Sequence, residues 1–171
     1  LVNAGIPNPV AALRNGTIGW TLAGQSLERG AGRRFPEVTP ALQAQAAVQA
    51  RAVADLARVK RLGLADVARL AAEVGRTTYL CDVPTPEEFA AGHVPGFRST
   101  PGGQLVQETD FTAPVRGARL VLLDDDGVRA NMSASWLAQM GWDDVHVLTD
   151  AFDGRKLETG PEKPELLAEP P

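Results

Sequence analysis

The fold is decided by residues 120–142, which read LVLLDDDGVRANMSASWLAQMGW. The first four residues are a short apolar run of the kind found in buried parallel strands. Residues 131–140 carry apolar side chains at helical spacing, and Gly141 follows as a helix stop. A strand, a tight loop and a helix in this order point backbone N–H groups and the positive end of the helix dipole at the loop. Such a loop is a natural site for an anion.

The loop between this strand and this helix carries three aspartates in a row, Asp124, Asp125 and Asp126. The chain thus supplies its own negative charge to the place where an external anion would bind. Carboxylates near the first turn of a helix stabilise the helix through hydrogen bonds and the dipole. We therefore interpret the aspartates as helix-capping residues and expect Arg129 to neutralise them.

The loop resembles the active-site loop of the rhodaneses, a family of sulfurtransferases in which the loop runs Cys-x-x-Gly-x-Arg-Ser or close to it. Gly127 and Arg129 stand where the family has its glycine and arginine, which sets Asp124 in the place of the cysteine nucleophile. The pseudo-active-site loop implied by this resemblance comprises Asp124, Asp125, Asp126, Gly127, Val128, Arg129 and Ala130.

A second and more specific motif lies upstream, in residues 80–97, LCDVPTPEEFAAGHVPGF. It is similar to the family signature Asp-Val-Arg, Glu-Tyr and Gly-His-Ile-Pro-Gly-Ala. The residues that match it in register are Asp82, Glu88, Gly92, His93, Pro95 and Gly96. Pro84 departs from the signature, which commonly has arginine there. Downstream, VHVLTDAFDG (145–154) resembles the family's strand and Gly-Gly turn, with Asp150 and Ala151 in place of the glycines.

The resemblance covers residues 62–160 and implies an α/β fold of the rhodanese type, with a central parallel sheet and helices on both faces. The hydrophobic pattern leads to the same fold class. It predicts strands at 77–83, 120–123 and 145–148, with a helix at 64–73 before the first of them. Strands separated by helical or irregular stretches favour a parallel sheet that is covered on both faces.

The chemistry of the family requires a thiolate, which attacks a sulfane sulfur and then carries it as a persulfide. A carboxylate has no sulfur atom to carry, and Asp125 and Asp126 would repel thiosulfate-like donors. The only cysteine is Cys81. On an alternating strand it shares a face with Tyr79 and Val83, so we interpret it as a buried core residue. The domain is therefore expected to be catalytically silent.

The supporting signature residues have simpler roles than catalysis. We expect His93 to be a hydrogen-bonding residue of its turn, Asp82 to end a strand beneath the loop, and Glu88 to lie in the first turn of a helix. His146 is isolated on a strand. No cofactor is predicted, and no metal is predicted either, because oxygen ligands from elsewhere in the chain are not evident.

Composition excludes several classes of protein. The 171 residues, of which 44% are hydrophobic, suffice for one good core. The net charge of −4, with a pI near 5.2 and no basic run, gives no support to nucleic-acid binding. No apolar stretch is long enough for a membrane span. A single cysteine excludes an internal disulfide and fits a reducing compartment, so a cytoplasmic location is expected.

An internal similarity divides the chain. Residues 1–30 resemble residues 137–160, and both read as a helix end, a glycine, a short strand and a turn. Chance similarity between α/β segments is the alternative explanation. From this similarity we predict that 1–30 is the C-terminal tail of a preceding rhodanese-like domain in a tandem protein. The rest is predicted to comprise a helical connector (31–61), the rhodanese-like domain (62–160) and a Pro/Glu-rich tail or linker (161–171).

The connector is expected to be one helix that begins at Thr39 and Pro40 and runs to a stop at Gly63. Its modest apolar stripe consists of Leu42, Ala46, Val53 and Leu56.

Three hypotheses for function follow. The first and favoured one is a silent rhodanese-homology domain that acts as a structural or regulatory part of a multidomain thiosulfate-type sulfurtransferase. Its partners would be other rhodanese-like domains of the same chain. The second is an enzyme with altered chemistry, whose acidic loop binds a cation or a positively charged substrate. The third is an interaction module whose loop binds a basic segment of a partner.

Overall fold

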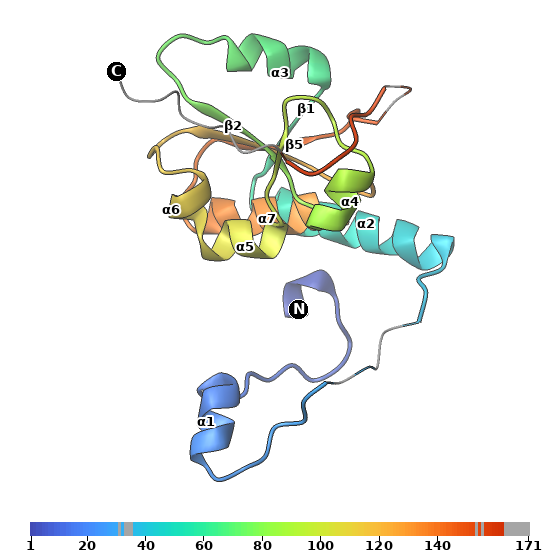
Figure 1. Ribbon diagram of the computed structural model, residues 1–171, viewed down its shortest axis with the longest axis vertical. Helices are drawn as coiled ribbons and strands as arrows, with labels where there is room; N and C mark the ends of the chain where they lie inside the picture. The colour runs from blue at the N-terminus through green and yellow to red at the C-terminus, as the bar shows by residue number, and fades with distance from the viewer. Residues whose placement is uncertain (31, 33–35, 153, 155, 163–171) are drawn as a thin grey trace.

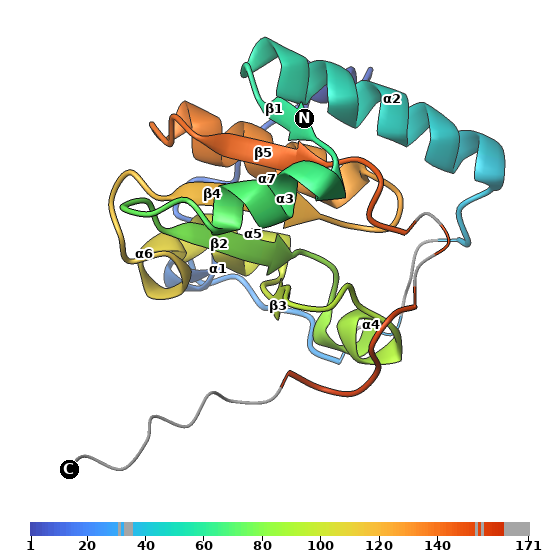
Figure 2. The same cartoon turned by 90° about the horizontal axis from the view of Figure 1, so that it is seen from above.

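The fold is built on a parallel five-stranded sheet. The structure is a computed structural model that describes residues 1–30, 32, 36–152, 154 and 156–162. The strands are β1 (Lys60–Leu62), β2 (Thr78–Asp82), β3 (Arg98–Ser99), β4 (Arg119–Leu123) and β5 (Val145–Leu148). Their order in the sheet is β1-β5-β4-β2-β3, which Figure 2 shows from above. The three strands predicted from the sequence are confirmed as β2, β4 and β5.

Helices cover both faces of the sheet (Figure 1). One face carries α2 (Pro40–Leu56), α5 (Gly102–Gln107) and α7 (Val128–Gln139), and α3 (Leu64–Ala71) lies on the other. The shorter helices are α4 (Pro86–Ala91) and α6 (Thr109–Thr112), and the N-terminal segment holds η1 (Val2–Ala4) and α1 (Gly16–Leu22). The predicted α/β class with a doubly covered parallel sheet is confirmed.

Each face of the sheet has its own hydrophobic core. On the α7 side, Leu120 and Leu122 of β4 pack with Leu105 and Leu137 from the helices. On the α3 side, Val121 and Leu123 of the same strand pack in the other cluster. All five residues of β4 are buried, because the central strand is covered from both sides. This strand therefore fixes the position of the loop that follows it.

The predicted connector helix is shorter than expected. It ends at Leu56, and residues 60–62 form β1, which pairs with β5. Ala54 and Val53 are buried, whereas Leu42 and Leu56 of the expected apolar stripe are exposed. The helix packs against α7 through its C-terminal half. Pairing with the open edge of β5 gives residues 60–62 backbone partners that continued helix would not offer.

The N-terminal segment also differs from expectation. It contains the helix α1 in place of the predicted short strand. A strand needs a neighbour for its backbone groups, and this segment does not lie beside the sheet, so local helical bonds satisfy the backbone instead. No residue of α1 is buried. Of the predicted Pro/Glu-rich tail, residues 163–171 lie outside the described part of the chain.

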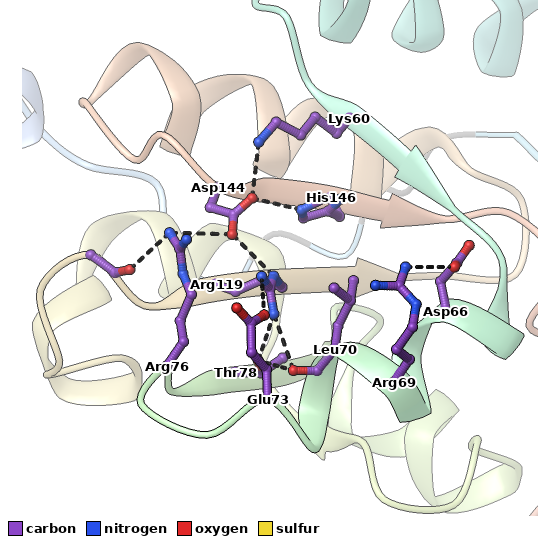
Figure 3. Close-up of polar contacts among 11 residues, drawn as sticks. Lys60, Asp66, Arg69, Leu70, Glu73, Arg76, Thr78, Arg119, Asp144 and His146 are labelled. Atoms are coloured by element: carbon purple, nitrogen blue, oxygen red, sulfur yellow. Dashed lines mark hydrogen bonds and ion pairs between the residues drawn. The ribbon is translucent and has the colours of Figure 1, made fainter.

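Opposite charges hold the amino-terminal edge of the sheet together around Asp144, directly before β5 (Figure 3). Its Oδ1 accepts a hydrogen bond from Lys60 Nζ (2.9 Å), and its Oδ2 accepts one from Arg119 Nε (3.0 Å) and lies 3.2 Å from Arg76. Burial by itself would raise the pKa of Asp144, but the hydrogen bonds from Lys60 and His146 outweigh it and hold the pKa well below its ordinary value.

No helix within the described residues combines the length and the apolar character that a membrane crossing requires.

Candidate functional site

The candidate site lies at the carboxyl edge of the sheet, where parallel α/β sheets commonly bind ligands. Asp82 is the last residue of β2, and Asp124 directly follows β4, its neighbour in the sheet. The pairing of Asp82 with Leu123 brings the two acids to the same end of the sheet. The loop 124–127 then leads into α7, and Gly127 adopts the left-handed conformation (φ 75°) that favours glycine.

Two of the three aspartates of the loop, Asp124 and Asp126, cap α7, as predicted. Oδ2 of Asp124 accepts hydrogen bonds from the backbone N–H groups of Arg129 (2.7 Å) and Ala130 (3.1 Å). Oδ1 of Asp126 accepts one from the N–H of Val128 (2.9 Å). Backbone donors that could hold an external anion are therefore already bound to the chain's own carboxylates.

Arg129 pairs with Asp125 of the loop, as predicted, and also with an acid outside the loop, Glu88. Its guanidinium donates two hydrogen bonds to Glu88 of α4 (2.6 and 3.1 Å) and lies 3.5 Å from Asp125. The hydrogen bond from Arg129 lowers the pKa of Glu88 to about 2. Glu88 also completes a capping box with Thr85, which confirms its place in the first turn of α4. Glu88 and Arg129 thus connect the two motifs.

Burial raises the pKa of two acids of the site, Asp82 and Asp124, and each has a side-chain oxygen without a hydrogen-bond partner. Burial, together with the charges of Asp124 and Asp125, raises the pKa of Asp82 to about 7. Burial also raises the pKa of Asp124 to about 6, against the lowering effect of the Ala130 N–H. Oδ1 of Asp82 and Oδ1 of Asp124 are both buried without a hydrogen-bond partner. Asp82 is thus beneath the loop, as predicted, but its Oδ1 accepts no hydrogen bond that would orient the loop.

A cavity of about 310 Å³ opens beside the loop. The aspartates 124–126 form one wall, Arg51 and Arg61 contribute to another, and Phe152 supplies apolar surface. Outside the lining of this cavity, the side-chain amide of Gln43 in helix α2 donates a hydrogen bond to Asp126 (3.3 Å). Arg61 is held by Asp55 and by the side-chain oxygen of Asn131 (3.4 Å).

Cys81 is a core residue, as predicted. Its side chain is 1% exposed and packs with Val83 and Tyr79 against the α7 side of the sheet. Burial raises the pKa of the Cys81 thiol to about 11. It lines a small cavity of about 170 Å³ that shares no lining residue with the cavity beside the acidic loop. The thiol has neither the position nor the ionisation of a nucleophile for this loop.

The two histidines have structural partners. His93 is buried, stacks on Phe89 with 3.7 Å between ring centroids, and bonds to the Phe89 carbonyl through Nδ1 (2.8 Å). The predicted hydrogen-bonding role is therefore confirmed. His146 was expected to be isolated, but its Nε2 lies 2.8 Å from Asp144 Oδ1. Burial lowers the pKa of His146, although Asp144 acts in the opposite direction.

Comparison with known proteins identifies the fold. The profile of the Rhodanese-like domain matches residues 64–157. The chain belongs to the rhodanese-like domain family. A crystal structure of a thiosulfate sulfurtransferase from Pseudomonas aeruginosa is 64% identical and superposes with a TM-score of 0.93. The match covers 99% of this chain and 32% of that protein, so the chain spans about a third of its relative's length. A comparison with curated proteins gives no match.

Within this rhodanese-like domain, sequence reasoning missed the contacts made between elements. The pairing of Arg129 with Glu88 had a usable signal, because two opposite charges fall in two motifs that meet at one sheet edge. Asp150, which replaces a family glycine, accepts the backbone N–H of Leu64 (2.7 Å) at the start of α3. The contact of Gln43 with the loop had no signal in the sequence.

Proposed function

We propose that this rhodanese-like domain does not transfer sulfur itself. In this proposal, Asp124 occupies the position of the family's cysteine nucleophile. The domain then serves as a structural or regulatory part of a multidomain thiosulfate-type sulfurtransferase. The relative that is 64% identical is a thiosulfate sulfurtransferase, which supports the sulfurtransferase context, and the acidic loop supports the silence of this domain.

One observation carries the proposal: the single thiol is absent from the loop. The only cysteine of the sequence is buried in the core, and carboxylate oxygens accept the hydrogen bonds of the loop's backbone donors. Thiosulfate would also meet the negative charges of Asp125 and Asp126 at the loop. Transfer of sulfur needs a thiolate that accepts the sulfane atom and releases sulfite, and no side chain of this loop can carry it.

We propose as well that other rhodanese-like domains of the same chain are the partners. In this arrangement residues 1–30 are the tail of a preceding domain, 31–61 the connector, 62–160 the domain itself and 161–171 a tail. The exposed apolar side chains of the N-terminal segment support this division, because they would be covered by a preceding domain. These exposed side chains include Leu1, Val2, Leu13, Ile18, Trp20 and Leu22.

The deciding experiment is a thiocyanate assay on the 171-residue chain with thiosulfate and cyanide. We expect no turnover above that of buffer. Mass spectrometry after incubation with thiosulfate provides a second measurement, and we expect no gain of a sulfur atom at Cys81. Turnover by this chain, or persulfide on Cys81, would contradict the proposal.

Asp124→Cys places a thiol where two backbone N–H groups already converge. We expect this variant to accept sulfur from thiosulfate as a persulfide with release of sulfite, at a rate limited by the adjacent aspartates. Asp124→Ser is the matched control, because serine is close to cysteine in size but has no thiol that could accept the sulfane sulfur. Equal labelling of both variants would show that the sulfur is held elsewhere, against the proposed position of the nucleophile.

A further inference from the structure

The N-terminal segment, residues 1–30, lies on the α7 side of the sheet and stands away from the body (Figures 1 and 2). Its helix α1 has 7 residues, none of them buried, and Ile18 and Leu22 are 72% and 82% exposed. Helices shorter than about 12–15 residues are marginal in water unless they pack on a neighbour. Apart from the contact of η1 with α2, the body supplies no such neighbour for the segment as described.

The relative from Pseudomonas aeruginosa keeps this segment in a similar place. The match covers 99% of this chain at a TM-score of 0.93. The segment makes up 30 of the 171 residues, so a score this high requires most of it to superpose together with the body. A segment with so few contacts keeps one position only if something beyond the body contacts it. In that protein, about two thirds of the chain lies beyond the matched 32% and can make this contact.

The body has an apolar surface on the side where the segment lies. Helix α7 packs on the sheet through its inner side and is flanked by α2 and α5. Trp136 and Met140 lie one turn apart on its outer side and are 54% and 53% exposed. Tryptophan and methionine are both enriched in protein interfaces relative to the rest of the surface. The outer side of α7 thus has the composition of an interface.

This apolar surface continues into a cavity of about 630 Å³ next to the C-terminal end of α7. Met140 and Trp142 line the cavity together with Val106 of α5. Charged side chains, among them Arg116 and Asp143, also line it. Interfaces between proteins commonly combine apolar and charged groups in this way, with an anchoring side chain of one partner in a pocket of the other.

We propose that the outer side of α7, with Trp136 and Met140 at its centre, is the docking surface for another rhodanese-like domain of the same chain. The inference rests on the proposed partnership between domains of one chain and names the surface that makes it. The N-terminal segment and this surface lie on the same side of the body, so one neighbouring domain can contact both. The length of chain beyond the match in the relative favours such a domain over a second copy of this chain.

Hydroxyl-radical footprinting with mass spectrometry tests the surface in two proteins. One is the 171-residue chain, and the other is the Pseudomonas enzyme with these residues grafted in place of their 64% identical counterpart. We expect Trp136 and Met140 to be oxidised several-fold more slowly in the graft. Val74 is the control, because it is 99% exposed and follows α3 on the opposite face of the sheet. Its oxidation should be equal in both proteins, and equal oxidation of Trp136 in both would overturn the proposal.

The outcomes separate this inference from the proposed partnership on which it rests. Protection of Trp20 in the graft without protection of Trp136 would keep the partnership and overturn the docking surface. Protection of neither tryptophan would contradict both. Protection of Trp136 that appears in the 171-residue chain as its concentration rises would assign the surface to a second copy and overturn the proposal.

A substitution shows whether Trp136 holds the neighbouring domain. Trp136→Asp in the graft should release the surface, so that Met140 is oxidised as fast as in the 171-residue chain. Val74→Asp is the matched control and should leave Met140 protected, and equal effects of the two variants would contradict the proposal. Circular dichroism checks that the graft folds. If it does not, the segment aligned with residues 132–140 is footprinted in the unmodified Pseudomonas enzyme, where oxidation as fast as in the 171-residue chain would overturn the proposal.

Discussion

Asp124 and Cys81 end up in opposite environments, although both lie close to the same sheet edge. The carboxylate takes part in the first turn of α7, where two backbone donors converge on it. The thiol faces the core between β2 and the helices on the α7 side, where burial disfavours its charged form. At the scale of single residues, the loop's backbone donors bind carboxylate oxygen, and the thiol lies in the core, where burial disfavours the thiolate more than the hydrogen bond from Thr100 favours it.

This separation predicts that Cys81 is chemically inert in the folded chain. With a pKa of about 11, roughly one thousandth of the thiol is ionised at pH 8, and the side chain is also 1% exposed. We expect iodoacetamide to leave Cys81 unmodified in the native chain and to modify it fully in urea, as measured by mass spectrometry. Rapid modification of the native chain would show that the thiol is accessible.

At the scale of elements, the strands that could be predicted are those whose side chains alone specify them. β4 and β5 are buried along their whole length and consist mostly of apolar residues, so the hydrophobic pattern was sufficient to predict them. β1 reads Lys-Arg-Leu after a helical stretch and becomes a strand only through pairing with β5, and β3 has two residues. Such short segments become strands because they pair with a neighbouring strand in the folded protein, and a local sequence pattern does not predict this pairing.

In the candidate site, too, the features set by local sequence could be predicted and the contacts between elements could not. The loop and its caps follow from a strand, a run of acids and a helix in sequence. The approach of Asp82 to the loop, the pairing of Glu88 with Arg129 and the reach of Gln43 from α2 depend on which elements become neighbours. The family resemblance predicted which motifs meet, but not which atoms of them pair.

The edge of the sheet opposite the loop supports a prediction about pH. The pKa of Asp144 is depressed in the folded state, so its contribution to stability is present above its unfolded pKa near 3.8 and is lost as the pH falls through the lower folded value. Asp144→Asn leaves the buried Arg119 without one of its partners. We expect the free energy of unfolding at pH 7 to fall by about 2–4 kcal/mol.

Urea denaturation at a series of pH values measures this effect. The difference between Asp144→Asn and the original chain should begin to shrink below about pH 4, because the carboxyl becomes protonated there in the unfolded state while it remains charged in the folded state. Asp143→Asn is the control, since this neighbouring acid is exposed, and we expect it to change stability by less than about 0.5 kcal/mol. A pH-independent difference would assign the effect of Asp144 to packing.

On the scale of the whole molecule, the chain consists of a packed body and an N-terminal segment with little contact to it (Figure 1). Helix α2 belongs to the body, because Ala50, Val53 and Ala54 are buried and the helix packs on α7. The segment before it touches α2 through η1, while α1 buries none of its residues. We therefore expect the packed body to fold stably without the N-terminal segment.

Removing residues 1–30 should change the free energy of unfolding by less than about 1 kcal/mol, because almost no apolar surface of the body is uncovered. Removing residues 1–56 is the contrasting truncation. It deletes α2, exposes the face of α7 that this helix covers, and should abolish a cooperative transition in urea. The shorter truncation should also reduce self-association, measured by sedimentation, because the exposed Leu1, Ile18 and Leu22 leave with it. A large loss of stability on removing 1–30 alone would mean that the segment is part of this domain and not the tail of another.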